Sequence, residues 1–282
     1  MAKDTRSVIA TAAKQGLGAE VEMLPVQADE TVRKLDQLIK LMDDQVHLQR
    51  VGLLQDGHIL RFNSSTGQRI ALSLPDAIDD YVQRVILRTR NFYEAKLLAT
   101  LQSLSIVTGA STVCDVGANI GNHSVFFGKI LGAGRVLAFE PQTHCYETLR
   151  ENLALNGLDD QSTAYNCMLG AVSGNGALSK FNARNLGGTS FVATEAGDVP
   201  MFALDDVLTT DVLQSLDLIK IDVEGMQMDV LLGAQGILEH RKPALWIELL
   251  AQTSAFDPAM KFLAQFGYLP TRIGPNDVIF RA

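Results

Sequence analysis

The feature that most constrains this chain is the alternation of apolar runs with helix-like segments from residue 109 to the end. STVCDVG, RVLAFE, TAYNCMLGAV and PALWIELL have the length and composition of strands, and HCYETLRENLALNG has the spacing of an amphipathic helix. LDLIKIDV is mostly apolar, which is typical of a parallel strand buried on both faces. This order predicts an α/β fold with a doubly wound, mostly parallel sheet. The closing YLPTRIGPNDVIFRA predicts a hairpin that leaves one strand antiparallel.

Two segments precede this region. Residues 1–28 show weak periodicity, and we expect them to be poorly ordered. Residues 29–108 predict an N-terminal extension of a helix, a β-hairpin and a second helix with Ser73 near its N-cap. Residues 109–282 would then form the ligand-binding domain. The extension is a candidate for oligomerisation and for a lid.

The first helix of this extension carries an apolar seam with steps of three and four residues. Its members are Val32, Leu35, Ile39, Met42 and Val46. One interpretation is an amphipathic helix packed on its own domain, and the other is a short coiled coil that makes a homo-oligomer. Two heptads are fewer than the three or four that identify a coiled coil, so both interpretations stay open.

Charge and cysteine content narrow the classes of partner. A net charge of -8 disfavours a general nucleic-acid binder, because phosphate neutralisation needs clustered Lys and Arg. Three cysteines without CxxC spacing favour a reducing, cytoplasmic environment over a disulfide or zinc framework. No uncharged apolar stretch reaches the roughly 18 residues of a membrane span. We therefore expect a cytoplasmic protein that handles a small molecule.

VCDVGANIGNHS joins a strand end to a glycine-containing turn. Gly117 and Gly121 permit a tight turn and let a ligand approach the N-terminus of the next helix. Asn tolerates the left-handed region better than other non-glycine residues, so Asn119 can replace a glycine there. Glu140 ends the next strand 19 residues after Gly121, where a carboxylate accepts both hydroxyls of a ribose. The turn and the acid predict an adenosine-type ligand.

Asp115 decides between two kinds of adenosine ligand. The turn lacks the G-x-G-x-x-G spacing that a dinucleotide needs, and an acid before the turn would repel a pyrophosphate. The same acid suits the cationic amino-acid end of S-adenosyl-L-methionine, so an NAD-dependent dehydrogenase is disfavoured. Glu94, before the core, is a candidate to close over the methionine end. The candidate cofactor-binding residues are Asp115, Gly117, Ala118, Asn119, Gly121, Asn122, Glu140, Pro141 and Glu94.

A third polar strand end lies in LIKIDVEG. Strand alternation puts Lys220 and Asp222 on the same side, and Glu224 enters the next helix. Glu224 is either a first-turn acid favoured by the helix dipole or a group that faces the substrate. A hydroxyl acceptor needs a general base, for which Asp222 is the first candidate, Glu224 the second and His123 the third.

Two questions about this site stay open. Asp222 and Glu224 with Glu248, which closes LWIEL, would offer oxygen donors for Mg²⁺, but a divalent metal is not the favoured interpretation. Residues 182–191, NARNLGGTSF, form either a loop over the site or an edge hairpin turn.

The chain resembles the FkbM-type S-adenosylmethionine-dependent methyltransferases in VCDVGANIGNHS, LAFEPQTHCYETLRENLALNG, LDLIKIDVEGMQMDVLLGA and PALWIEL. The resemblance covers roughly residues 90–280. It implies a Rossmann-like class I methyltransferase fold and O-methylation of a sugar, polyketide or similar hydroxyl, with S-adenosyl-L-homocysteine as product. By matching position, it also implies that Asp115, Gly117, Asn119 and Gly121 line the cofactor and that Glu140 takes its ribose. The alternative is a non-catalytic adenosine-ligand-binding module within a biosynthetic assembly.

Overall fold

The structure, a computed structural model, describes residues 24–52, 54, 58–249 and 256–282. Most of the segment expected to be poorly ordered therefore lies outside the described residues. Contacts divide the chain into two compact units, residues 1–49 and 50–282. This division falls within the long helix α2 (Leu24–Gly52), whereas the sequence predicts a domain boundary at residue 109.

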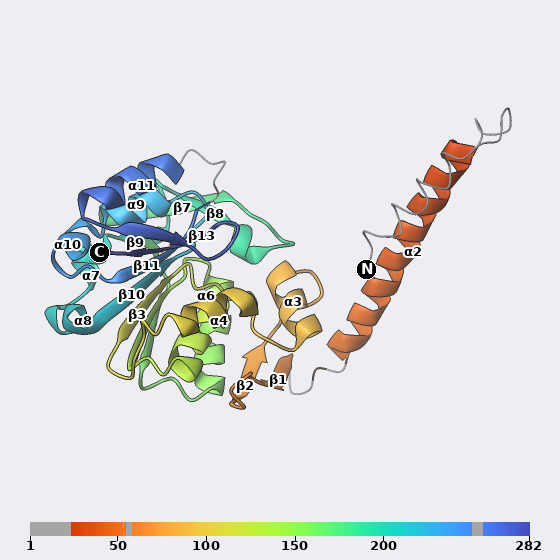
Figure 1. Cartoon of the computed structure of the whole chain (residues 1–282), viewed down its shortest axis with the longest axis horizontal. Helices are drawn as coiled ribbons and strands as arrows, with labels where there is room; N and C mark the ends of the chain where they lie inside the picture. Colours follow the sequence, from red (N-terminus) through yellow and green to blue (C-terminus); the bar gives the residue numbers. More distant parts are fainter. Residues whose placement is uncertain (1–23, 53, 55–57, 250–255) are drawn as a thin grey trace. The chain divides into compact units, whose positions relative to one another are not determined.

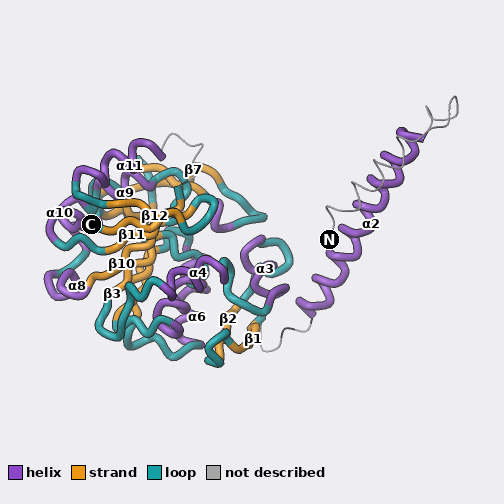
Figure 2. Tube along the Cα trace, viewed as in Figure 1, coloured by secondary structure: helices purple, strands orange, loops and turns teal. Residues whose placement is uncertain are grey.

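The larger unit is built on a seven-stranded sheet with the order β12-β13-β11-β10-β3-β4-β5 (Figures 1 and 2). All neighbouring strands are parallel except β13, which is antiparallel to both β11 and β12. The predicted mostly parallel α/β sheet with one antiparallel strand is confirmed. The strands are β3 (Thr112–Val116), β4 (Arg135–Phe139), β5 (Ser162–Tyr165), β10 (Leu216–Ile221), β11 (Ala244–Glu248), β12 (Leu269–Arg272) and β13 (Asp277–Arg281).

Helices cover both faces of this sheet, so its inner strands contribute to two cores, whereas the residues of the edge strand β12 are exposed. Along β3, Val113 belongs to one core and Cys114 to the other, as strand alternation requires. The first core is shared with α4 (Ala95–Ser103), α5 (Asn122–Val125), the π-helical η1 (Phe126–Ile130) and α6 (Thr143–Leu155). The second is shared with α7 (Leu204–Val207), α8 (Thr210–Ser215), α9 (Gln227–Leu232), α10 (Gln235–His240) and α11 (Phe256–Gln265).

A β-hairpin, β1 (Ile59–Asn63) and β2 (Arg69–Ser73), packs its apolar face into the first core. The next helix, α3 (Tyr81–Thr89), begins later than the sequence predicts. Asp80 is its N-cap and accepts a hydrogen bond from the Gln83 amide at 2.8 Å. The expected N-cap at Ser73 is wrong, because Ser73 is the last residue of β2.

A second, four-stranded sheet has the order β6-β9-β7-β8. It contains β6 (Met168–Leu169), β7 (Gly174–Lys180), β8 (Ser190–Ala193) and β9 (Val199–Phe202), with the short 3₁₀ turn η2 (Leu186–Gly188) between β7 and β8. The run TAYNCMLGAV, predicted as one strand, is divided between β5 of the central sheet and β6 of this second sheet.

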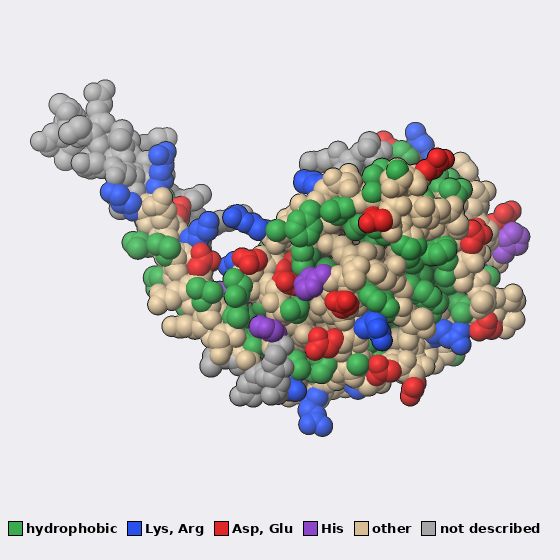
Figure 3. Space-filling view, turned by 180° about the vertical axis from the view of Figure 1, so that it is seen from behind, with side chains coloured by type: hydrophobic (Ala, Val, Ile, Leu, Met, Phe, Trp, Pro, Cys, Tyr) green, Lys and Arg blue, Asp and Glu red, His purple; other side chains and the backbone are tan. Residues whose placement is uncertain are grey.

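The outer surface is mixed in character. Figure 3 shows acidic and basic side chains interspersed with apolar ones over one face. None of the helices in the described part of the chain has the length and apolarity to cross a membrane.

Candidate active site

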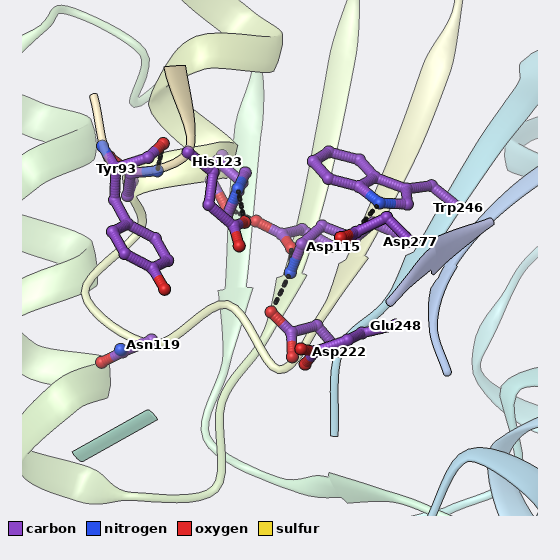
Figure 4. A network of polar contacts seen from close by, with 12 residues as sticks. Tyr93, Asp115, Asn119, His123, Asp222, Trp246, Glu248 and Asp277 are labelled. Carbon is purple, nitrogen blue, oxygen red and sulfur yellow. Dashed lines mark hydrogen bonds and ion pairs between the residues drawn. The ribbon is translucent and has the colours of Figure 1, made fainter. Parts of the chain in front are cut away.

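A cavity lies at the carboxyl ends of β3, β4, β10 and β11, and it gathers residues that are far apart in sequence (Figure 4). Parallel strands end at the same edge of a sheet, which is why the residues that follow them meet there. The predicted residues that line it are Glu94, Gly117, Ala118, Asn119, Asn122, His123, Glu140, Pro141, Asp222 and Glu224. Asp115 and Gly121 lie behind this lining.

The turn after β3 uses left-handed backbone at three positions. The φ angles are 78° at Gly117, 49° at Asn119 and 82° at Gly121. A Cβ on Gly117 would lie 1.9 Å from the Asp222 carbonyl oxygen, so only glycine lets β3 and β10 approach here. Asn119 takes the left-handed conformation that its sequence position predicts. Its buried Oδ1 has no hydrogen-bond partner among the described residues.

Glu140 is held rigidly at the end of β4. Its side chain is buried, and its two oxygens each accept a backbone amide at 2.8 Å, from Asn119 and from Gln142. Burial raises the pKa of Glu140 to about 7, although the two amide hydrogen bonds favour the charged form. The turn after β3, residues 117–121, is called the cofactor turn below. It and the Glu140 carboxylate thus form one hydrogen-bonded unit.

Asp115 contacts buried partners instead of the cavity. It is fully buried, and one of its oxygens accepts a hydrogen bond from the Ser124 hydroxyl at 2.6 Å. The other oxygen lies 3.4 Å from Lys220 Nζ, which is also 3.1 Å from Asp222 Oδ2. Burial alone would lower the pKa of Lys220, but the carboxylates of Asp222 and Asp115 raise it above the usual lysine value.

Asp222 and Glu248 form a carboxyl pair in the cavity wall. Burial alone would raise the pKa of Asp222, but Lys220, a hydrogen bond with Glu248 and His123 together lower it. Burial and the charge of Asp222 raise the pKa of Glu248 to about 9. The two pKa shifts therefore have opposite directions, favouring the charged form of Asp222 and the protonated form of Glu248. Glu224 is exposed and lies in the loop before α9, not in the helix as the sequence predicts, and its pKa is raised by desolvation and by Asp222.

The cofactor turn also holds the segment before α4. Asn122 accepts the Tyr93 amide at 2.9 Å and donates to the Tyr93 carbonyl at 3.3 Å. This clamp positions Glu94, which has a φ of 57° and a carboxylate oxygen 3.3 Å from His123 Nε2. A left-handed non-glycine residue beside a cavity marks a position that the surrounding structure fixes.

Trp246, on β11, packs against His123 and Lys220. Its indole is 1% exposed and donates to Asp277 Oδ1 at 2.9 Å. The ring centroid lies 5.2 Å from that of His123, and Lys220 Nζ lies 5.9 Å from it, within the range of a cation–π contact. Figure 4 shows His123, Trp246 and Asp277 around Asp115.

The segment 182–191 is both a lining loop and the start of an edge strand. Asn185, Gly187, Thr189 and Phe191 line the cavity, and β8 is at the edge of the second sheet. The Leu186 amide donates to the buried Asp80 carboxylate at 2.8 Å, and the Leu186 carbonyl accepts from Gln142 at 2.9 Å. These contacts fix the loop against the cavity.

Sequence reasoning did not assign Lys220 or Trp246 to this site. Lys220 carries a recognisable signal, a lysine inside the apolar strand run LDLIKIDV two residues before an acid. Trp246 carries none, because only the folded chain brings it against His123 and Lys220. The sequence does indicate Tyr93, which adjoins Glu94, and Asn185, which lies in the segment 182–191. His144, four residues after Glu140, pairs with Asp76 at 2.7 Å on the surface and does not line the cavity.

The sequence leaves a Mg²⁺ site at Asp222, Glu224 and Glu248 open as an alternative. No group of three or more His, Cys, Asp or Glu side chains in the part of the chain that the structure describes is disposed to hold a metal ion. Asp222, Glu224 and Glu248 do all line the cavity.

A family model matches more than half of the chain. Residues 115–270 match the methyltransferase FkbM domain. Methyltransferase sdnD of Sordaria araneosa is 31% identical over 155 residues, which are 43% of this chain and 59% of that protein. The chain thus spans less than two thirds of the length of this curated relative.

Two solved structures show weaker similarity. Methyltransferase FkbM from Methylobacillus flagellatus KT aligns over 62% of this chain and 44% of its own, with 16% identity and a TM-score of 0.48. A methyltransferase from Geobacter sulfurreducens aligns over 71% and 87%, with 15% identity and a TM-score of 0.43.

Proposed function

The chain belongs to the methyltransferase FkbM domain family, and from this premise we propose that it transfers a methyl group from S-adenosylmethionine to a hydroxyl of a small metabolite or sugar. The observation that carries the proposal is the lining of one cavity by Glu140 and the cofactor turn together with the charged carboxylate of Asp222. A saccharide or polyketide hydroxyl is the acceptor class that we propose.

The cavity has the donor and acceptor set that an adenosine cofactor needs. Glu140 offers two carboxylate oxygens at the end of β4, where ribose hydroxyls bind in sheets of this kind. Asn119 and Asn185 each have a buried side-chain oxygen without a partner among the described residues, and both residues line the cavity. Buried acceptors of this kind favour a ligand that brings N–H or O–H donors. We assign the ribose hydroxyls to Glu140. The other N–H and O–H donors of the cofactor would then bind the side-chain oxygens of Asn119 and Asn185.

Asp222 is the group that we propose as general base. When bound, S-adenosylmethionine supplies a methyl group on a cationic sulfur. An acceptor hydroxyl that forms the new O–C bond must lose its proton, and Asp222 is ionised, one-third exposed and part of the cavity wall. Glu224 and His123 also line the cavity and are the second and third candidates.

Part of the cavity lining is apolar. Tyr93, Phe191, Val223 and Met226 are among the lining residues. Apolar walls exclude water from a displacement reaction and hold a carbon-rich acceptor in place. They support a small organic acceptor, such as a polyketide or a sugar that packs one face of its ring.

Two measurements test this function. Calorimetry with S-adenosylmethionine and S-adenosylhomocysteine detects the cofactor site, and labelled-methyl transfer to a panel of sugars and polyketides detects the reaction. Transfer to oxygen with release of S-adenosylhomocysteine is expected. Tight cofactor binding without transfer across a broad panel would favour the non-catalytic binding module.

The base assignment makes a sharper prediction. Asp222→Asn is expected to retain S-adenosylhomocysteine binding and to lower turnover by roughly 10²–10⁴-fold, because the acceptor proton then has no charged base. Asp206→Asn, an acid outside the cavity lining, is the matched control. Near-normal turnover of Asp222→Asn would move the role to Glu224 or His123.

A further inference from the structure

A buried lysine connects the cofactor strand to the acceptor side of the cavity. Lys220 is 2% exposed and is paired in register with Asp115 on the neighbouring strand β3, so both side chains lie on the same face of the sheet. Its ammonium group lies 3.4 Å from Asp115 and 3.1 Å from Asp222. A buried charge needs such partners to offset its loss of hydration.

The two partners of Lys220 differ in their surroundings. Asp115 is fully buried and also accepts a hydrogen bond from Ser124 at 2.6 Å. Asp222 is 33% exposed and lines the cavity. The carboxylate of Asp115 thus stabilises the charged form of the buried Lys220 ammonium. That positive charge in turn stabilises the negative charge of Asp222 at the cavity surface.

Glu248 is the second carboxyl beside Asp222. It ends β11, the strand adjacent to β10, and Figure 4 shows its side chain next to that of Asp222. No cation among the described residues forms an ion pair with Glu248, whereas Asp222 has Lys220. Two adjacent carboxyls rarely ionise together, so the pair retains one proton near neutral pH.

We infer that Lys220 is a positioning residue that fixes the negative charge on Asp222 and leaves the proton of the Asp222–Glu248 pair on Glu248. The consequence for methyl transfer, which rests on the proposed function, is that the base Asp222 is charged before the acceptor binds. After Asp222 has accepted the hydroxyl proton, the pair holds two protons and returns to its resting state by releasing one. The other charged or titratable groups around Asp222 are Asp115, His123, Glu94, Tyr93, Glu224 and Asp277.

Titration of the side-chain carboxyls by ¹³C NMR tests this directly, with assignments from Asp222→Asn and Glu248→Gln. Lys220→Met is expected to raise the titration midpoint of Asp222 by about one pH unit or more, because an opposite charge at this distance shifts a carboxyl by roughly 1–3 units. Lys261→Met removes an exposed lysine on α11 and is expected to leave it unchanged. An Asp222 midpoint that is the same in Lys220→Met and in the wild type overturns the inference.

A second variant keeps the test decisive if Lys220→Met does not fold. Glu248→Gln is isosteric and is expected to abolish a carboxyl titration that we expect near pH 9 in the wild type, where burial and the charge of Asp222 raise the pKa of Glu248. A carboxyl that still titrates near pH 9 in this variant would place the proton elsewhere and overturn the inference. The titration needs neither cofactor nor acceptor, so absence of methyl transfer would count against the proposed function alone.

Discussion

At the residue scale, two carboxyls of the cavity have pKa values shifted in opposite directions, although burial raises both. Glu140 has only neutral backbone amides as direct partners, and burial raises its pKa to about 7. Asp222 has an ammonium group at 3.1 Å, and its pKa is lowered despite burial. A nearby full charge outweighs desolvation, whereas two amide dipoles do not. The cofactor carboxylate is therefore the more sensitive of the two to pH.

Cofactor affinity is expected to depend on pH through Glu140. The raised pKa means that the carboxylate is charged above about pH 7 and protonated below it, and only the charged form accepts both ribose hydroxyls. Affinity for S-adenosylhomocysteine should fall as pH drops below about 7, by at most about tenfold per unit. Calorimetry from about pH 6 to about pH 8 measures this. Identical affinities across that range would contradict the ribose assignment.

Substitution separates Glu140 from other titrating groups. Glu140→Gln should bind more weakly by about 1–3 kcal/mol above pH 7, through loss of charged hydrogen bonds, and with little of the wild-type pH dependence. Glu147→Gln, an exposed acid on α6, serves as the matched control and should retain the wild-type profile.

Local chemistry explains which site residues the sequence could predict. Asn119 and Glu140 can be predicted from the sequence, because a left-handed turn and an acid at the end of a strand are each recognisable within a few residues. The Asn122–Tyr93 clamp and the Asp80–Leu186 hydrogen bond join residues 29 and 106 positions apart. No spacing rule predicts such pairs, since they depend on how separate elements dock.

At the element scale, Asn152 of α6 and Asn156 at the C-cap of that helix form hydrogen bonds with the free edge of β2. Asn152 accepts the Ser73 amide at 2.6 Å, and Asn156 accepts the Ala71 amide at 3.1 Å and donates to its carbonyl at 2.7 Å. Alternate residues of a strand point their backbone groups to the same edge, and i,i+4 positions of a helix share a face. The helix thereby replaces the next strand of the hairpin.

This side-chain pairing is expected to stabilise the fold measurably. Asn152→Ala leaves the buried amide of Ser73 and the carbonyl of Ile120 without this partner, so the free energy of unfolding should fall by about 1–3 kcal/mol. Urea unfolding measures the change, with Asn63→Ala on the exposed face of the same hairpin as control. Equal losses in the two variants would show that the amide pairing contributes nothing.

Element prediction succeeded where burial imposes a pattern. The strands β3, β4 and β10 are apolar because helices cover both faces of the sheet. The second sheet was missed because β7 is mostly exposed and contains two glycines, so it shows neither a buried run nor alternation. The late start of α3 was missed because its N-cap, Asp80, also accepts a hydrogen bond from the amide of Leu186, a residue far away in the sequence.

At the scale of the whole molecule, the chain combines a two-core catalytic unit with a helix that has its own apolar seam. The seam residues Val32, Leu35, Ile39, Met42 and Val46 are all exposed. The sequence located this seam, but it could not choose between intramolecular packing and self-association, because both demand the same periodicity. We propose that a second copy of α2 covers it.

Point substitutions in the full chain test this proposal. The double variant Ile39→Gln and Met42→Gln keeps helix propensity and removes apolar surface, so it should lower the molar mass found by light scattering from that of an oligomer to that of a monomer. Lys40→Gln, between the two positions, is the matched control. A monomeric wild type, or an oligomer that survives both substitutions, would rule out pairing through α2.

Trp246 is the only tryptophan among the 282 residues, and it is buried against Lys220 and against His123, which lines the cavity. Indole emission responds to nearby charges, to proton donors and to access of water. The intrinsic fluorescence of this protein therefore comes from one location, within contact distance of the groups that hold the cofactor turn and the carboxyl pair. Ligand occupancy and protonation at the site can be followed optically in the unlabelled chain.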